Sequence, residues 1–502
     1  MRPPLSTFRA VTHAFRSLRN RNYRLFWSGQ LVSLAGTWMQ DVALSWLVLS
    51  LTDSPAALGL TMTIRFLPAL LFSLYSGVLA DRLPKRRTIL VTQAIQLMVA
   101  LTLAVLSSTE LVTVGLIYVL AAIRGLVDSV EGPARQSFVP EMVGTADLPN
   151  AVALNSMLFN GARIVGPAIG AVVISTLGMA ACFYINAASF MATIGALLAM
   201  RTGELRLVPR ASRDSSWRQL SEGFRYARST PEVVVIFIVM GMLGAFGYNF
   251  QTLLPLVAKY LLGEGASGLA LLTTTMGAGS VVAGLFVAYQ GRPTLRLLLG
   301  SAGAFVVLLV FVALSRWTVV TAVLLFVSGI VGVLFMTTAN TRLQLDVPDH
   351  LRGRVMGIYV LLFIGTTPIG SYLIGFLAEH LSSDSVVGVR GTVLCMAGLC
   401  AAGLAAGLLY HRRAGGGPPA EHHPASPVGS LRRPPPAHMR GTARGQGPGL
   451  PAHPAVPALS AVPGRRLRGP GRRRGGTLAR RPLLLTRLRA GPAWEISYIF
   501  SP

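Results

Sequence analysis

Long apolar runs separated by short polar segments dominate the first 410 residues of the chain. A helix needs about 20 mostly apolar residues to cross a bilayer, and twelve runs reach roughly that length. The predicted runs are 25–50, 57–80, 88–108, 112–131, 151–176, 180–200, 232–258, 267–290, 294–314, 318–342, 354–380 and 387–410. The pattern predicts an all-α membrane protein with twelve transmembrane helices, the first of them retained and not a cleaved signal peptide.

Basic residues are concentrated before the first run and in the even-numbered loops. The clusters are Arg16, Arg19, Arg21 and Arg24; Arg82, Lys85, Arg86 and Arg87; Arg201, Arg206, Arg210, Arg213, Arg218, Arg225 and Arg228; and Arg352 and Arg354. Because Lys and Arg are retained on the cytoplasmic side of a membrane, both termini are predicted to be cytoplasmic.

The sixth loop is the longest, and it contains the segment SSWRQLSEGFRYARS. Its residues Trp217, Leu220, Phe224 and Ala227 fall on one helical face, and Ser216 with Gln219 three residues later fits a capping box. Two interpretations stay open: an amphipathic helix on the inner membrane surface, or a linker helix that packs on the bundle.

An internal repeat divides the apolar part of the chain into two halves. The segment QSFVPEM (136–142) recurs as QLDVPDH (344–350), 208 residues later. Six helices plus six, joined by a long inner loop, is the parallel repeat of secondary transporters. The predicted domains are an amino-terminal segment 1–24, a six-helix half 25–200, a linker 201–231, a six-helix half 232–411 and a tail 412–502.

Composition fits a lipid-embedded chain, since 52% of the 502 residues are hydrophobic and 13% are charged. Soluble domains carry about 25% charged residues. The net charge of +26 does not indicate nucleic-acid binding, because fourteen Arg against two acidic residues from Ala414 onward account for +12 of it. Lys85 and Lys259 are the only lysines, and neither precedes Ser or Thr, so no phosphate-binding loop and no ATP are expected.

The tail from Ala414 is rich in Pro, Gly and Arg and cannot bury enough apolar surface to fold. It is either a disordered arm or an out-of-frame extension through GC-rich DNA, and its composition favours the second. No cofactor or metal site is predicted, because Cys182, Cys395 and Cys400 lie in apolar runs and no metal-ligand spacing occurs.

Ionisable groups inside apolar runs are costly and therefore point to function. Asp41 lies midway along the first run, where loss of water favours a neutral carboxyl group, so it is a candidate proton carrier. Arg65 and Arg163 are candidates to pair with Asp41 or to contact an anionic substrate. The polar candidates for the lining of a substrate cavity, or for hydrogen bonds between helices, are Asn155, Asn160, Asn249, Gln251 and Asn340.

The segment GVLADRLPKRR resembles the signature loop of the major facilitator superfamily between its second and third helices. Its matching residues are Gly77, Asp81, Arg82, Lys85 and Arg86, and Pro84 replaces the usual second Gly. Further segments, among them PARQSFVPEMV and NTRLQLDVPDHLRGRVMGIY, resemble the branch that contains the enterobactin exporter and macrolide-efflux-type proteins. Together the resemblance covers about residues 10–410.

The resemblance implies proton-coupled export of a siderophore-like or drug-like small molecule by alternating access, in a bacterial plasma membrane. It also implies a proton-transfer role for Arg124, with an ion pair between Arg124 and Asp128 as the alternative. The segment GARIVGPAIGA resembles the helix-five motif of antiporters through Gly166, Pro167 and Gly170.

The same resemblance implies a gate at the inner membrane face. Asp81 is expected to lie against the start of the eleventh helix, near Gly353, where the helix carries partial positive charge. Lys85 or Arg86 is expected to contact Asp128 or Glu131.

The expected partners are a small-molecule substrate, protons and the lipid bilayer, and the chain is expected to be a monomer without nucleic acid. An importer or uniporter with the same fold is the alternative, because sequence orientation does not give transport direction. A membrane enzyme or receptor is disfavoured, since no nucleophile–base pair or metal-ligand spacing occurs.

Overall fold

The computed structural model describes residues 15–206, 216–289, 294–363 and 365–414, and the regular elements in these ranges are helical. In chain order they are η1 (Arg16–Arg19), α2 (Arg21–Thr52), α3 (Pro55–Arg82), α4 (Lys85–Ser108), α5 (Val114–Val143), α6 (Leu148–Leu177), α7 (Met179–Leu198), η2 (Thr202–Glu204), α8 (Ser216–Ser229), α9 (Pro231–Met242), η3 (Leu243–Gly247), α10 (Phe250–Leu256), η4 (Val257–Leu261), α11 (Ala266–Tyr289), α12 (Leu295–Leu314), α13 (Thr318–Asp346), α14 (Asp349–Phe363), α15 (Thr367–His380) and α16 (Ser385–Arg413). The predicted tail lies outside the described residues from position 415 onward.

Two of the predicted runs are interrupted. The run 232–258 becomes α9 and α10, each followed by a π-helical turn, η3 and η4. The run 354–380 becomes α14 and α15, and α14 begins at Asp349, four residues before the expected start at Gly353. The fourth helix, α5, continues to Val143 past the predicted end at 131, with Pro133 and Pro140 inside it.

Eleven segments of the described chain are long and apolar enough to cross a membrane. The long helix α5 is not among them, although it has 30 residues. It carries Arg124, Asp128, Glu131 and Arg135, which lower its hydropathy. With these eleven segments the chain is an all-helical membrane protein. The helix α5 differs from the other long helices in the number of charged residues that it carries.

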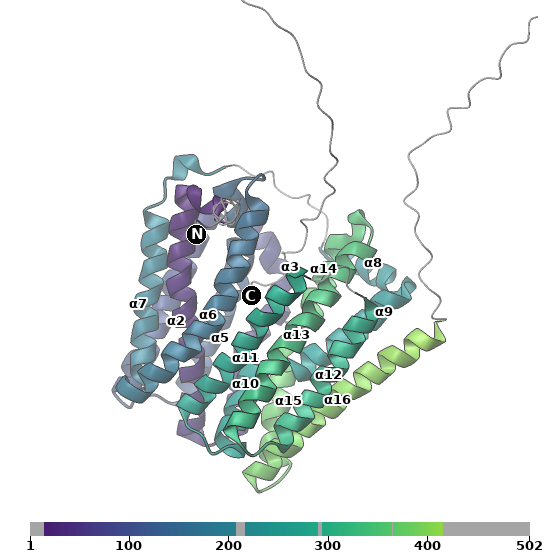
Figure 1. Ribbon diagram of the computed structural model, residues 1–502. Coiled ribbons are helices and arrows are strands. Elements are labelled where there is room, and N and C mark those ends of the chain that lie inside the picture. Colours follow the sequence, from purple (N-terminus) through teal and green to yellow (C-terminus); the bar gives the residue numbers. More distant parts are fainter. Residues whose placement is uncertain (1–14, 207–215, 290–293, 364, 415–502) are drawn as a thin grey trace, which may run out of the picture. The chain divides into compact units, whose positions relative to one another are not determined.

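The helices of the first half, α2 to α7, lie on one side, and those of the second half, α9 to α16, lie on the other (Figure 1). Between the halves, α3 packs against α15 and α6 packs against α11. The second helix of each half thus contacts the fifth helical run of the other half, a reciprocal arrangement that an internal repeat would produce.

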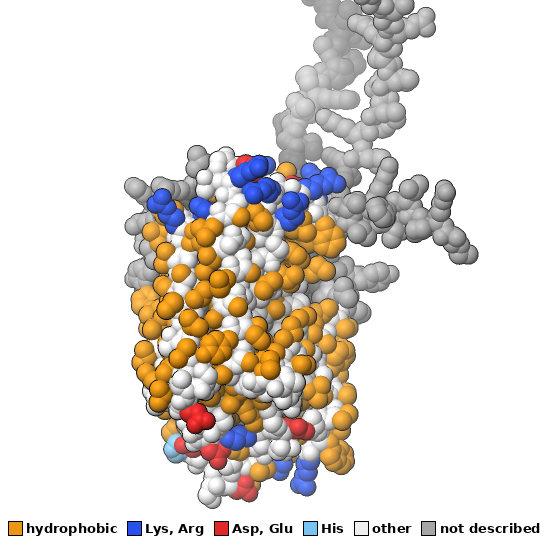
Figure 2. All heavy atoms as spheres, turned by 90° about the vertical axis from the view of Figure 1, so that its left-hand side faces the viewer, with side chains coloured by type: hydrophobic (Ala, Val, Ile, Leu, Met, Phe, Trp, Pro, Cys, Tyr) orange, Lys and Arg blue, Asp and Glu red, His pale blue; other side chains and the backbone are white. Residues whose placement is uncertain are grey.

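Figure 2 shows apolar side chains across the middle of one face of the bundle. Lys and Arg side chains gather at the upper end of this face, and acidic and basic side chains are mixed at the lower end. The upper end, where α4 begins, is called the Lys85 end below, and the lower end, where α2 finishes, is called the Asp53 end. An apolar band between two polar ends is the surface that a bilayer requires.

Polar contacts join the two halves at the Asp53 end. Lys259 in η4 lies 2.7 Å from the Asp53 carboxylate, and its ammonium group donates to the carbonyl oxygen of Leu49 over 2.6 Å. The Glu379 carboxylate of α15 accepts hydrogen bonds from the Ser54 hydroxyl and, at 2.8 Å, from the Ala56 amide at the start of α3. A residue of the second half thus caps a helix of the first half.

The linker helix α8 packs against α14 and α9. Glu222 of α8 forms an ion pair with Arg354 of α14. Phe224 and Ala227, which the sequence places on one face, differ in burial: Phe224 is exposed and Ala227 is buried. The structure therefore shows contact with the bundle, as one of the two interpretations expects, and it leaves an apolar side chain facing outward.

Candidate functional site: a charged cavity between the two halves

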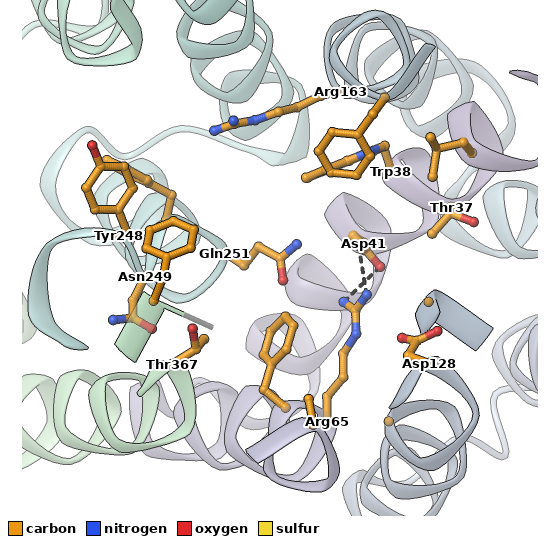
Figure 3. Close-up of a pocket in the computed structure, with 18 of the residues that line it drawn as sticks. Thr37, Trp38, Asp41, Arg65, Asp128, Arg163, Tyr248, Asn249, Gln251 and Thr367 are labelled. Atoms are coloured by element: carbon orange, nitrogen blue, oxygen red, sulfur yellow. Dashed lines mark hydrogen bonds and ion pairs between the residues drawn. The ribbon is translucent and has the colours of Figure 1, made fainter. Parts of the chain in front are cut away.

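A cavity of about 580 Å³ lies between the two halves and is lined by both. Figure 3 shows Asp41, Arg65 and Asp128 on one wall, with Tyr248 and Asn249 facing them. Arg65, Arg163, Asn249 and Gln251, four of the residues considered for a substrate cavity, line this cavity. Its volume suits a drug-sized molecule.

Asp41 of α2 is held between two arginines from neighbouring helices. Its Oδ1 lies 2.7 Å from Nη1 of Arg124 in α5 and 3.0 Å from Nη1 of Arg65 in α3, and its Oδ2 accepts from Nη2 of Arg65 over 3.1 Å. All three residues are buried. Each buried charge thereby meets an opposite one, as low-dielectric surroundings require.

Gly125 allows α5 to come close enough to α3 for this arrangement. A β-carbon at this position would lie 2.1 Å from the carbonyl oxygen of Arg65, which is far inside van der Waals contact. Because Arg124 is the preceding residue, the close approach of the two backbones brings its side chain to Asp41. In the sequence Arg124 stands directly before Gly125, but this spacing alone does not predict the contact between Arg124 and Asp41.

Two further carboxylates of α5 continue the charged wall. Asp128 accepts from Nε2 of Gln96 over 2.6 Å and lies 3.8 Å from Nε of Arg124. Glu131 accepts from Nε2 of Gln93 over 2.7 Å and lies 3.8 Å from Arg135. The alternative ion pair between Arg124 and Asp128 is thus present, but it is longer than the contact of Arg124 with Asp41.

The structure corrects the expected partners of the basic loop residues. Lys85 pairs with Glu141 at 2.6 Å, and Nε of Arg86 donates to the carbonyl oxygen of Leu197 over 2.8 Å. Neither contacts Asp128 or Glu131, because α5 continues past 131 and presents Glu141 at the Lys85 end. Gly77, Asp81 and Arg82 belong to the last turns of α3, and their side chains lie outside the described part.

Three predicted cavity residues do not line the cavity. Asn160 donates from its side chain to the carbonyl oxygen of Ser156, within its own helix. Asn340 accepts a hydrogen bond from Gln344 over 2.7 Å, also within its helix. Asn155 lies about one turn before Phe159, which does line the cavity.

Asn249 lies at the break between the π-helical turn η3 and α10. Its side-chain nitrogen donates to the carbonyl oxygen of Ala245 over 2.6 Å, and its oxygen accepts from the Ser371 hydroxyl over 3.2 Å. The hydroxyl of Thr252 donates to Ser371 over 2.9 Å. Asn249 therefore joins the broken helix to α15, so its role as a hydrogen-bond link between helices is visible in the structure.

Arg163 of α6 lies in the upper part of the view in Figure 3 and extends across the cavity on the side of Tyr248. Its guanidinium carbon is 5.9 Å from the ring centre of Trp38 in α2. Gly166, one turn later, allows this packing, since a β-carbon there would be 2.6 Å from Cβ of Trp38. Gly166 and Pro167 of the helix-five motif are thus buried in the contact between α6 and α2.

The sequence did not single out Gln93, Gln96, Arg135, Trp38 or Tyr248. A signal existed for Arg135, because positions 124, 128, 131 and 135 recur at spacings of four, three and four and so share one helical face. In the ranges that the structure describes, no group of three or more His, Cys, Asp or Glu side chains is placed to hold a metal ion.

A family profile described as transmembrane secretion effector, within the major facilitator superfamily, matches residues 12–415. The chain belongs to this family. It is a multi-pass membrane transporter of the bacterial plasma membrane. The family and the relatives named below are transporters.

Curated relatives support the same family. The staphyloferrin A transporter of Staphylococcus aureus is 25% identical over 74% of this chain and 94% of its own length. The multidrug efflux pump Tap of Mycolicibacterium fortuitum is 27% identical over 70% and 87%, respectively. The enterobactin exporter EntS of Salmonella choleraesuis is 24% identical over 75% and 90%.

Solved structures show the same fold. The nucleoside transporter NupG aligns with a TM-score of 0.61 at 15% identity and covers 78% of this chain and 99% of its own. An auto-inhibited peptide transporter of the POT family aligns with a TM-score of 0.62 at 13% identity, over 78% and 97% of the two chains.

Proposed function

We propose that this chain is a proton-coupled exporter of a small molecule that works by alternating access. The observation that carries the proposal is the buried Asp41 carboxylate, held by Arg65 and Arg124 in the wall of a cavity that both halves line. An ionisable group at this depth in a transporter has a high cost unless it has a function.

Asp41 would carry the proton. In the structure it contacts two guanidinium groups, and a proton added to it would remove the charge that both of them face. Arg65 and Arg124 would then lose their shared partner, which changes the packing of α2, α3 and α5. Arg124 would couple proton binding to movement, because it also faces Asp128.

The proposed topology has twelve spans with both termini in the cytoplasm. The helix α5 would be the twelfth span, because its 30 residues suffice for a bilayer and its charges face the cavity. The Lys85 end would be cytoplasmic, because Lys and Arg gather there. The domain boundaries follow as 1–24, 25–200, 201–231, 232–411 and a tail from 412.

The contacts at the Asp53 end support a state in which the outer side is closed. Asp53 and Lys259 join the halves there, as do Glu379 and the start of α3. Export would require these contacts to separate while the Lys85 end closes. In that second state Asp81 would lie against the start of α14, and Asp81→Asn is expected to slow transport without lowering the amount of protein in the membrane.

The exported substrate would be siderophore-like or drug-like. Three relatives carry such descriptions: a staphyloferrin A transporter, an enterobactin exporter and a multidrug efflux pump. Each covers at least 70% of this chain, so the proposal extends over both halves.

The test uses the purified full chain in liposomes that hold a pH-sensitive dye. Siderophores, macrolides and cationic dyes are added one at a time under an imposed proton gradient. A substrate should produce proton movement with the parent chain, a reduced signal with Asp41→Glu and none with Asp41→Asn. The control is Glu204→Gln, which removes an exposed acid far from the cavity. Equal signals from Asp41→Asn and the parent would contradict the coupling role.

A further inference from the structure

The charges that line the cavity do not balance. Four arginines, Arg65, Arg124, Arg135 and Arg163, face it with three acids, Asp41, Asp128 and Glu131, which leaves a net charge of +1. The three acids all have arginine partners within 4 Å. Arg163 is the arginine left over, since no carboxylate of the described residues forms an ion pair with it.

The surroundings of Arg163 hold it in place without neutralising it. Trp38 provides an aromatic face 5.9 Å from its guanidinium carbon, and Phe159 packs edge-to-face on Trp38 at 5.7 Å. A cation–π contact fixes the position of a guanidinium group but uses none of its N–H donors. A guanidinium group presents its N–H donors in a planar fork, and this geometry matches a carboxylate.

Gln251 adds an unused acceptor to the same cavity. Its Oε1 is buried and has no hydrogen-bond partner among the described residues. In Figure 3 its amide lies near the centre of the cavity, between Asn249 and Asp41. A buried acceptor without a partner has a cost, which a bound molecule with an N–H or O–H group would remove.

Aromatic side chains complete the lining. Tyr248, Phe250 and Phe363 belong to the second half, and Trp38 and Phe159 belong to the first. Tyr248 stacks on Phe305 with ring centres 4.8 Å apart, and because Phe305 is not among the residues that line the cavity, this contact orients the Tyr248 ring from outside the cavity. Such walls accommodate a flat, apolar body and not a fully hydrated ion.

We propose that the substrate is an organic anion with an aromatic body and at least one hydrogen-bond donor. Its carboxylate or comparable oxyanion binds Arg163, its aromatic part lies between Trp38 and Tyr248, and its donor group faces Gln251. The inference rests on the proposed transport function, because it names the class of molecule that the same cavity takes. A cationic substrate is disfavoured, since it would bring a second positive charge beside Arg163.

The first test compares three probes with the same ring system on the purified full chain. The probes are 6-hydroxy-2-naphthoate, the neutral 6-hydroxy-2-naphthamide and the cationic 6-hydroxy-2-naphthylmethylammonium, each at millimolar concentration; the hydroxyl group gives all three the same hydrogen-bond donor. The naphthoate is expected to raise the thermal unfolding temperature and to bind about tenfold tighter than the amide, as a charge-assisted contact implies. Equal binding of all three, tighter binding of the cation, or no binding of naphthoate would overturn the inference.

Variants place the effect on Arg163. Arg163→Gln should weaken naphthoate binding about tenfold and leave naphthamide binding unchanged, whereas Arg163→Lys should keep part of the preference. The matched control, Arg316→Gln, removes an exposed arginine outside the cavity and should change neither. Loss of binding for both probes in Arg163→Gln, with an unchanged unfolding temperature, would contradict a specific contact with the anion.

Failure of this inference is distinguishable from failure of the proposed function. If cationic dyes drive Asp41-dependent proton movement in liposomes while naphthoate does not bind, proton-coupled export stands and the anion preference is wrong. If naphthoate binds through Arg163 and no substrate moves protons, the anion site stands and the coupling is wrong.

Discussion

The wall that the first half contributes to the cavity holds all seven charged side chains among the described lining residues, and the second half contributes none. The first wall is a network in which Asp41, Asp128 and Glu131 alternate with arginines. The second wall is uncharged and combines aromatic, aliphatic, amide and hydroxyl side chains around a broken helix. Two halves with the same helix arrangement thus present different chemistry to one molecule.

If the chain is a proton-coupled exporter as proposed, this difference gives the two halves separate tasks. A charged network responds to a proton, because removal of one charge leaves its partners unmatched. A wall of aromatic and amide groups responds to the shape and hydrogen bonds of a substrate. We therefore expect changes in the first wall to affect stability and coupling most strongly, and changes in the second to affect binding and helix geometry.

The largest effect is expected from breaking the charged wall at Arg124. Arg124→Leu leaves Asp41 and Arg65 in a network with one partner missing, and removal of one member of a buried ion pair costs about 3–5 kcal/mol. Thermal unfolding of the purified chain measures the loss. Arg316→Leu, at an exposed site, is the control, and equal stability of the two variants would show that the network does not act as a unit.

A smaller effect is expected from separating α3 and α5 without changing any charge. Gly125→Ala places a methyl group 2.1 Å from the Arg65 carbonyl oxygen, and overpacking of this kind costs about 1–3 kcal/mol. Gly115→Ala, in the same helix with nothing within 4 Å, should leave the unfolding temperature nearly unchanged. Similar temperatures for the two variants would mean that the close approach is not required.

In the uncharged wall, Asn249→Ala should cost about 1–2 kcal/mol, because the hydrogen bonds to Ala245 and Ser371 are lost. Asn160→Ala is the matched control, since its bond stays within one helix. We expect the Asn249 variant to lower the unfolding temperature and to slow transport, while Asp41-dependent proton release is retained. If Asn249→Ala abolished Asp41-dependent proton release, the second wall would also be required for proton coupling, which would contradict this expectation.

The smallest effect concerns the Asp53 end. Hydrogen bonds from Lys259 and then Tyr260 hold the pKa of Asp53 below its ordinary value. The contribution to stability is therefore present above the ordinary pKa of about 3.9 and is lost as the pH falls through the folded value. Acid should narrow the difference in unfolding temperature between the parent and Asp53→Asn, and a constant difference down to low pH would contradict this.

Hydropathy predicted most of the helices, because lipid requires long apolar runs whatever their neighbours. Ten of the twelve runs correspond to single helices. The break near Asn249 was not predicted, since it depends on a hydrogen bond to another helix. The separation of α14 from α15 was not predicted either. The end of α5 was placed too early, because its charged face looks like a loop in sequence but lines a cavity in the structure.

Candidate site residues were recognisable where a charge interrupts an apolar run. Asp41, Arg65, Arg124 and Arg163 stand out in this way, and the structure places all four in the cavity lining. Their pairing was not predictable, since it depends on helix rotation and on close approaches such as that at Gly125. The partners assigned to Lys85 were wrong for a different reason: α5 continues past its predicted end, so Glu141 lies in a helix where a loop was expected.

The cap that Glu379 places on the start of α3 has a consequence for how the halves part. Both of its hydrogen bonds lie at an exposed site, and water can take over each donor as soon as the carboxylate withdraws. If the two halves separate at the Asp53 end, the Ala56 amide can form a hydrogen bond to water and is not left without a partner. The contact at this end is thus built from hydrogen bonds that water can replace, whereas the ion pairs around Asp41 are buried, and under the proposed mechanism a proton releases them.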